Sequence, residues 1–227
     1  MRPWLGLERT LDALNRVAEA RNLRTENGNP VRFVPPGAKD AYYELKVFRS
    51  GEVETRPDNL HDFFNALAWL AFPRAKARIN AMHAAQMPRE NGHRGRLRDL
   101  LTVFDEGGAI VECEDAELLA HLEHGRWKTL FWQNRDRVRE SMRITVFGHA
   151  VMEKVLEPWP GIACKALIVR PGIDLDEAVH TWLAGLQPAA SPRDLGPVPV
   201  FGYPGWAVQT EAFYEDARYV RPLRPNR

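Results

Sequence analysis

The feature that most constrains the fold is a nearly all-apolar segment, LHDFFNALAWLAF at residues 60–72, followed directly by Pro73. A helix that is hydrophobic on almost every side belongs in a protein core. Proline lacks a backbone N–H and disfavours helical geometry in the residue before it, so the helix must break or kink there. The sequence therefore predicts one helix that begins at an N-cap, Asp58 or Asn59, and a second over residues 74–87.

Polar side chains interrupt these helices at regular spacings. His61 and Asn65 are four residues apart and share one face, and Lys76, Asn80 and His83 share a face of the second helix. A buried polar group without a partner costs about 1–3 kcal/mol, so each of these groups needs one. If the chain folds back at the proline, the two polar rows converge on one cavity.

A first hypothesis makes this cavity the site of a metal-assisted hydrolase that acts on a phosphate-containing or other small anionic substrate. Histidine titrates near neutral pH and is a common metal ligand, and lysine binds phosphate and carboxylate groups. The candidates are catalytic His61, Asp62, His83 and His149, substrate-binding Asn65, Lys76, Asn80 and Arg98, and metal-binding His61, His83 and Asp105. The cofactor expected on this hypothesis is a divalent metal.

A second hypothesis is a non-catalytic binding or assembly module, in which the same side chains form a buried structural network. The sequence contains no H-E-x-x-H, C-x-x-C, G-x-S-x-G or G-x-G-x-x-G pattern, and no phosphate-binding loop. His149 and Glu153 are four residues apart, which is typical of an ordinary helical pair and also of a carboxylate that orients an imidazole. Both hypotheses therefore stay open.

The remaining patterns predict hairpins and helices in separate groups, which favours an α+β fold over regular β-α-β alternation. We expect a mainly helical single domain over residues 1–227, with β-hairpins forming a small antiparallel or mixed sheet and a Pro/Gly-rich C-terminal wrap over 188–227. The expected helices are 8–24, 115–124, 126–141, 144–157 and one from Asp174 or Asp176 to about Leu183. The expected strands are 31–34, 42–49 paired with 52–55, a hairpin over 100–114 that turns at 105–108, 163–169, and a short strand near Tyr219.

Charge and cysteine content narrow the class of protein further. The net charge is +1, which argues against nucleic-acid and anionic-membrane binding. The chain has two cysteines, far apart and outside any C-x-x-C spacing, as expected of free thiols in a reducing compartment. No apolar run approaches the roughly 18–20 residues that cross a bilayer. We therefore expect a cytoplasmic protein, whose oligomeric state the sequence leaves open.

Several motifs resemble a bacterial family known as domain of unknown function 3025. They are the run Asp58–Lys76 with Asn80, the run Arg98–Thr102 with Phe104–Glu106, the run Phe147–Ala150 with Glu153 and Lys154, and Pro204–Trp206 with Phe213 and Tyr214. The likeness covers nearly the whole chain. It implies one domain and a bacterial origin, and it implies no particular activity.

Overall fold

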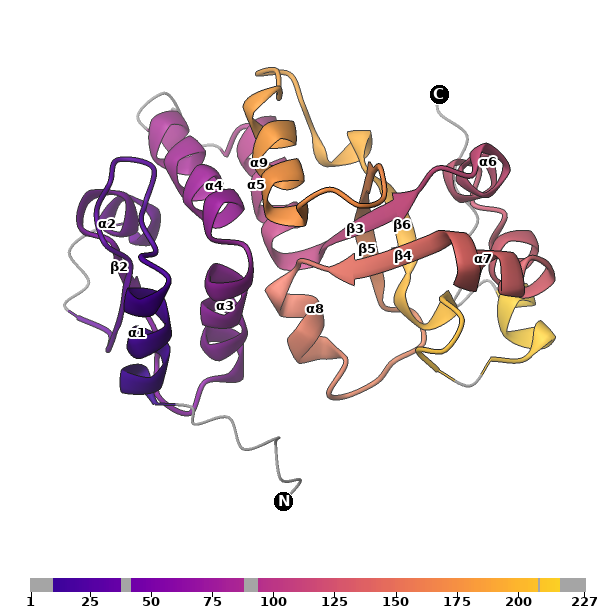
Figure 1. Cartoon of the computed structure of the whole chain (residues 1–227), viewed down its shortest axis with the longest axis horizontal. Helices are drawn as coiled ribbons and strands as arrows, with labels where there is room; N and C mark the ends of the chain where they lie inside the picture. Colours follow the sequence, from indigo (N-terminus) through magenta and orange to yellow (C-terminus); the bar gives the residue numbers. More distant parts are fainter. Residues whose placement is uncertain (1–9, 38–41, 88–93, 208, 217–227) are drawn as a thin grey trace.

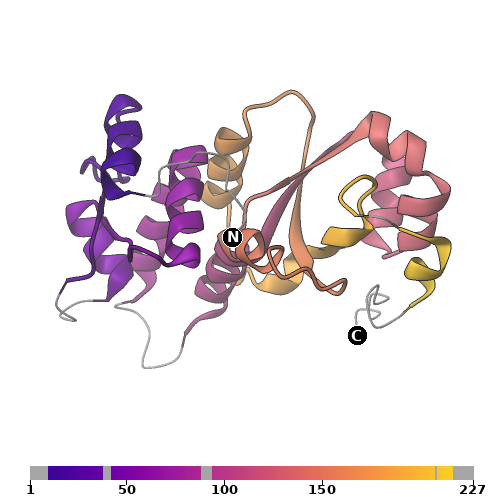
Figure 2. The same ribbon diagram turned by 90° about the horizontal axis from the view of Figure 1, so that it is seen from below.

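A computed structural model describes residues 10–37, 42–87, 94–207 and 209–216 of the chain. Its elements form an elongated body, with the N-terminal helices at one end, a mixed sheet in the middle and helices α6 and α7 at the other end (Figure 1, Figure 2). The helices are α1 (Leu11–Ala20), α2 (Tyr43–Ser50), α3 (Leu60–Ala71), α4 (Pro73–Gln86), α5 (Arg96–Gly107), α6 (Ala116–Glu123), α7 (Arg135–Ser141), α8 (His149–Lys154) and α9 (Leu175–Ala184), with a π-helix η2 (Lys128–Gln133) and short 3₁₀ turns η3 (Pro192–Asp194), η4 (Val200–Gly202) and η5 (Glu211–Glu215). The strands are β1 (Arg32–Val34), β2 (Glu52–Glu54), β3 (Gly108–Cys113), β4 (Met142–Val146), β5 (Ala163–Val169) and β6 (Gly196–Pro199).

The N-terminal part packs α1, α2 and α3 around a small parallel pair of strands, β1 and β2. Phe33 of β1, Val47 of α2 and Trp69 of α3 are all buried in its hydrophobic cluster. The apolar face of α3 is therefore buried in this cluster. The polar residues of α3 lie on a different face of the helix.

The sheet has the strand order β4-β3-β5-β6, with β3 and β5 parallel and the two edge strands antiparallel to their neighbours. Ile110 of β3 packs with α4, α5 and α9, whereas the next residue, Val111, packs with α6, η2 and α7. The sheet is thus covered on both faces, as expected for a central strand that is apolar at successive positions. Helix α8 contacts α3 and helix α9 contacts α4, which joins the sheet to the N-terminal part.

The predicted α+β class and the mixed sheet are confirmed, as is the break at Pro73. Asn59 caps α3, because its side chain accepts a hydrogen bond from the backbone N–H of Asp62. Phe72 has φ −130° and ψ 59°, outside the helical region, and Pro73 occupies the first turn of α4. Asp176 of α9 accepts hydrogen bonds from the first two free N–H groups of α4, those of Arg74 and Ala75.

The strand predicted over residues 42–49 is wrong, since this stretch is helix α2. Alternating apolar residues and aromatic side chains suggested a strand, but propensity is weak and tertiary packing overrides it. Val47 is fully buried, α2 packs on α4, and Gly51 ends the helix with φ 77°. As a consequence β2 pairs in parallel with β1 and forms no hairpin with residues 42–49.

The hairpin predicted over residues 100–114 is also wrong. Its first half is helix α5, whose buried residues Leu97, Leu100, Leu101 and Phe104 follow the spacing of one helix face. Only the second half is a strand, β3. The pair Asp105 and Glu106 therefore lies in the last turn of a helix and not in a β-turn.

Three further predictions need smaller changes. The helix expected over 144–157 is strand β4 followed by the short helix α8, and the helix expected over 126–141 is divided into η2 and α7. Strand β6 lies within the segment expected to be an irregular wrap, and the strand expected near Tyr219 falls outside the described residues. The strand at 163–169 and the helix after the N-cap Asp174 are confirmed.

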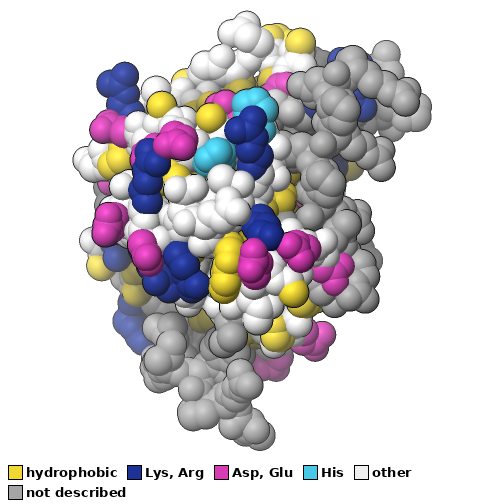
Figure 3. Space-filling model, turned by 90° about the vertical axis from the view of Figure 1, so that its right-hand side faces the viewer, with side chains coloured by type: hydrophobic (Ala, Val, Ile, Leu, Met, Phe, Trp, Pro, Cys, Tyr) yellow, Lys and Arg dark blue, Asp and Glu magenta, His cyan; other side chains and the backbone are white. Residues whose placement is uncertain are grey.

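Among the described residues, no helix combines the length and the apolar character that a membrane crossing requires. On the face formed by the right-hand end of Figure 1, basic and acidic side chains are interspersed (Figure 3). This mixture agrees with the near-zero net charge.

Candidate functional site

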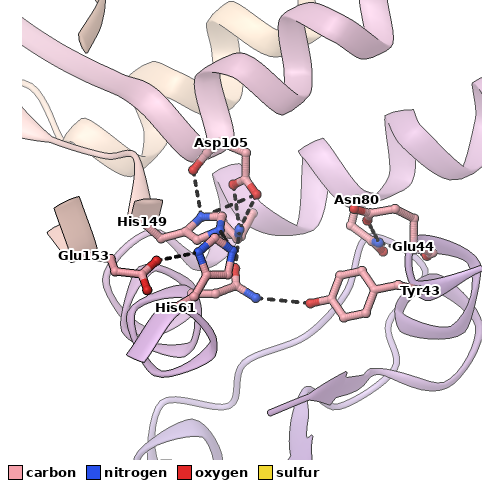
Figure 4. Close-up of polar contacts among 9 residues, drawn as sticks. Tyr43, Glu44, His61, Asn80, Asp105, His149 and Glu153 are labelled. Atoms are coloured by element: carbon pink, nitrogen blue, oxygen red, sulfur yellow. Dashed lines mark hydrogen bonds and ion pairs between the residues drawn. The ribbon is translucent and has the colours of Figure 1, made fainter. Parts of the chain in front are cut away.

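A polar pocket of about 350 Å³ lies where α2, α3, α4, α5 and α8 meet. Every site residue predicted from the sequence lines it: His61, Asp62, Asn65, Lys76, Asn80, His83, Arg98, Asp105 and His149. The remaining lining residues are Tyr43, Glu44, Glu54, Arg56, Trp69, Ile79, Arg94, Thr102 and Glu106. Figure 4 shows His61, His149 and Asp105 on one side of the site and Tyr43, Glu44 and Asn80 on the other.

Lys76 and Asp105 form a buried ion pair at the floor of the pocket. Lys76 Nζ lies 2.5 and 2.8 Å from the two carboxylate oxygens of Asp105 and donates a third hydrogen bond, of 2.8 Å, to Asn65 Oδ1. Burial raises the pKa of Asp105, but the charge and hydrogen bond of Lys76 together with the nearby His149 and His83 outweigh it, so the pKa lies below its ordinary value. Because an ammonium has three N–H groups, this network uses all of them.

His149 is held in one tautomer by the end of α5. Its Nδ1 lies 2.8 Å from the backbone carbonyl oxygen of Asp105, which can only accept, so Nδ1 carries the hydrogen. Burial lowers the pKa of His149 to about 4, so the ring is neutral near pH 7. Its Nε2 therefore presents a lone pair.

His61 lies between that lone pair and a carboxylate. Its Nε2 is 3.2 Å from Nε2 of His149, and its Nδ1 is 3.0 Å from Oε2 of Glu153. The contact with His149 needs a hydrogen on Nε2 of His61, and the contact with Glu153 needs one more hydrogen. Both contacts are hydrogen bonds at the same time only when this second hydrogen lies between His61 and Glu153, on one atom or the other.

Asn80 anchors the opposite wall. Its Nδ2 donates to the backbone oxygen of Glu44 at 2.9 Å and to Glu44 Oε2 at 2.7 Å. This fixes the amide orientation, because a carbonyl cannot donate, and it leaves Asn80 Oδ1 buried without a partner among the described residues. Burial raises the pKa of Glu44. The hydroxyl of Tyr43 accepts a hydrogen bond of 3.1 Å from Asn65 Nδ2, and 38% of the Tyr43 surface is exposed to solvent.

Two other predicted residues, His83 and Asp62, form hydrogen bonds with arginines at the pocket wall. His83 is buried, which lowers its pKa to about 4, and its Nδ1 accepts a 3.3 Å hydrogen bond from Arg98 Nε. Asp62 accepts hydrogen bonds from the guanidinium of Arg56 at 2.7 and 2.9 Å. Burial raises the pKa of Asp62, but the contacts with Arg56 outweigh it and the net shift is downward.

The predicted metal ligands His61, His83 and Asp105 line one pocket without forming a ligand set. Within the described ranges, no three His, Cys, Asp or Glu side chains are grouped so that they could hold a metal ion. Lys76 occupies both oxygens of Asp105. The structure thus gathers the predicted residues but not as a metal centre.

Among the residues whose contacts are described above, the sequence did not point to Tyr43, Glu44 and Arg56, and it predicted the wrong partner for Glu153. Tyr43 and Glu44 fell in the stretch predicted to be a strand, although Gly51 directly after it is a typical helix stop. Arg56, which holds Asp62, carried no motif. Glu153 was expected to pair with His149 four residues earlier, whereas its carboxylate contacts His61.

The fold and the pocket define an α+β protein whose histidines, carboxylates and cations converge from five helices. The chain belongs to the family described as protein of unknown function (DUF3025), whose model matches residues 31–224. No curated protein and no solved structure matches the chain. The family resemblance expected from the motifs is confirmed, and the function has to be argued from the pocket.

Proposed function

We propose that this chain is an enzyme that uses the acidic proton shared by His61 and Glu153, and that it hydrolyses a phosphate-containing or other anionic substrate. The observation that carries this proposal is the hydrogen-bond chain from Glu153 through His61 to His149. Glu153 orients the His61 ring from behind, since it does not line the pocket, and His149 accepts the proton that faces the pocket. A carboxylate that orients an imidazole in this way is a recurrent acid–base arrangement.

A bound substrate would replace His149 as the acceptor of the His61 Nε2 hydrogen. His61 then donates this proton to the leaving oxygen while water attacks the phosphorus or acyl carbon, and it takes a proton from the attacking water to return to its first state. Arg94 and Arg98 line the same pocket, and their positive charges would attract the anionic group of the substrate. Lys76, whose hydrogens are already used, positions Asp105 in this proposal and does not bind substrate.

The proposal predicts a large loss of turnover when His61 is replaced. The assay uses nitrophenyl phosphate, bis(nitrophenyl) phosphate and nitrophenyl acetate. We expect His61→Asn to lower kcat by about 100-fold or more and Glu153→Gln by about tenfold, because general acid–base catalysis contributes about 10²–10⁴-fold. His124→Asn, a change at an exposed histidine, is the matched control. Unchanged turnover in His61→Asn would contradict the proposal, and dialysis against a chelator tests the metal expected from the sequence.

A second candidate, a non-catalytic binding module, is favoured by the saturated contacts of Lys76. If the polar residues serve only as a structural network, His61→Asn should lower the melting temperature substantially. On the catalytic proposal the melting temperature changes little, because the side chain of His61 is 37% exposed. Thermal unfolding of the same variant therefore separates the two functions.

A further inference from the structure

We infer that the substrate of this pocket carries a positively charged nitrogen, such as an ammonium group, that pairs with the carboxylate of Glu44. The inference rests on the proposed function only in that it concerns the same pocket. It adds to the anionic group proposed above, so the substrate would be a compound with both charges. Glu44 lies opposite the acid–base pair, on the Tyr43 and Asn80 side of the site (Figure 4).

The first support is that no cation among the described residues pairs with Glu44. Three other carboxylates of the pocket wall that are shielded from water each pair with a cation: Glu54 with Lys46 at 2.8 Å, Asp62 with Arg56 at 2.7 Å and Asp105 with Lys76 at 2.5 Å. The fifth, Glu106, is exposed to water. Across the part of the chain that the structure describes, no ion pair involves Glu44 within 4.0 Å, and buried carboxylates are normally paired.

The second support is that Glu44 is held in place as a binding group would be. Asn80 fixes its Oε2 and its backbone carbonyl, whereas Oε1 has no hydrogen-bond partner among the described residues. This anchor leaves Asn80 Oδ1 buried with no hydrogen-bond partner in the described part of the chain, which costs about 1–3 kcal/mol. A stability cost of this kind is typical of a position kept for function.

The third support is the electrostatic environment of the Glu44 carboxylate. Burial raises the pKa of Glu44, and the hydrogen bond from Asn80 and the charges of Lys76 and Arg98 offset this only in part. A cation that enters the pocket supplies the partner that these residues do not. An anionic group would instead meet the Glu44 carboxylate directly, so it is expected on the arginine side.

The test compares two probes that share one ring, benzylammonium and benzyl alcohol. Binding near neutral pH is followed by protein-observed NMR. We expect benzylammonium to bind about tenfold more tightly than benzyl alcohol, as expected for one charge-assisted hydrogen bond. Glu44→Gln should remove this preference, because glutamine still accepts the hydrogen bond from Asn80 but has no charge. Glu54→Gln is the matched control, since Glu54 already has Lys46 as its partner, and it should leave the preference intact.

Equal affinity for benzylammonium and benzyl alcohol, no saturable binding of benzylammonium, or an unchanged preference in Glu44→Gln would each overturn the inference. Circular dichroism of both variants checks that they fold. The result is separable from the proposed function, because His61→Asn should keep the benzylammonium preference while it loses turnover. If His61→Asn keeps both the benzylammonium preference and the turnover, the result contradicts the catalytic proposal and leaves the Glu44 inference standing.

Discussion

At the scale of single residues, this pocket is determined by which hydrogen-bond roles are allowed. The carbonyl of Asp105 fixes the tautomer of His149, and that tautomer obliges His61 to donate. Lys76 gives all three of its hydrogens to Asp105 and Asn65. The hydrogen between His61 and Glu153 is therefore the one on which the proposed acid–base role depends.

Two buried histidines give the stability of the protein a defined dependence on pH. Burial lowers the pKa of His83 and of His149 from 6.5 to about 4, so between these values the unfolded chain binds more protons than the folded one. The stabilisation that comes from keeping these two histidines neutral is therefore fully present above pH 6.5. It is lost as the pH falls towards about 4. We expect a loss of about 2 kcal/mol per histidine between pH 7 and pH 5.

Urea unfolding at the two pH values measures this loss. His83→Gln should reduce the difference by about 2 kcal/mol, because glutamine still accepts from Arg98 but does not titrate. His124→Gln, at an exposed position, should leave the difference unchanged. Identical pH dependence in His83→Gln and the unchanged protein would show that His83 is not held neutral by burial.

At the scale of elements, the site depends on a close approach between α8 and the end of α5. A Cβ atom on Gly148 would lie 2.5 Å from the backbone oxygen of Glu106 and 2.6 Å from the backbone nitrogen of Gly107. Neither atom can rotate away, so only glycine permits this approach. The next residue, His149, is thereby placed against the carbonyl of Asp105.

Gly148→Ala should consequently destabilise the protein and displace His149. We expect the free energy of unfolding to fall by about 1–3 kcal/mol, the usual cost of overpacking. The NMR signals of the His149 ring should also change as its bond to Asp105 lengthens. Gly185→Ala is the control, because its Cβ would meet only ordinary contacts at 3.6 and 3.9 Å, and its stability should change by less than about 0.5 kcal/mol. A stable Gly148→Ala protein with unchanged His149 signals would contradict this account.

At the scale of the whole molecule, the pocket is built across the boundary between the N-terminal helices and the sheet. Helices α2 and α3 pack in one hydrophobic cluster, and α5 packs in another with the sheet and α9. Helices α3 and α8 bring His61 and His149 together from opposite sides of that boundary. We propose that the chain is a single domain, because the site would come apart if the two parts separated.

Native-state hydrogen exchange tests this proposal. The slowest-exchanging amides of α3 and of β3 should open with the same free energy, within about 1 kcal/mol, since one cooperative unit has one global unfolding reaction. If α3 opens at a free energy several kcal/mol below that of β3, the two parts are separate folding units.

The sequence by itself determined the break at Pro73, the cap at Asn59 and the faces on which His61, Asn65, Lys76, Asn80 and His83 lie. These features are local, because proline chemistry and helical periodicity act over a few residues. It also determined the α+β class and the family. The helix α5 could have been predicted too, since Leu97, Leu100, Leu101 and Phe104 already show its period.

Only the tertiary structure decided what these side chains contact. Glu153 pairs with His61, which is 92 positions away in the chain, and not with the neighbour that helical spacing suggested. The carboxylate of Asp105 is taken by Lys76, which removes it from the expected metal set. Glu44 and Tyr43 entered the site because α2 packs on α4. Such contacts depend on long-range packing, and they decide which groups are neutral and which are paired.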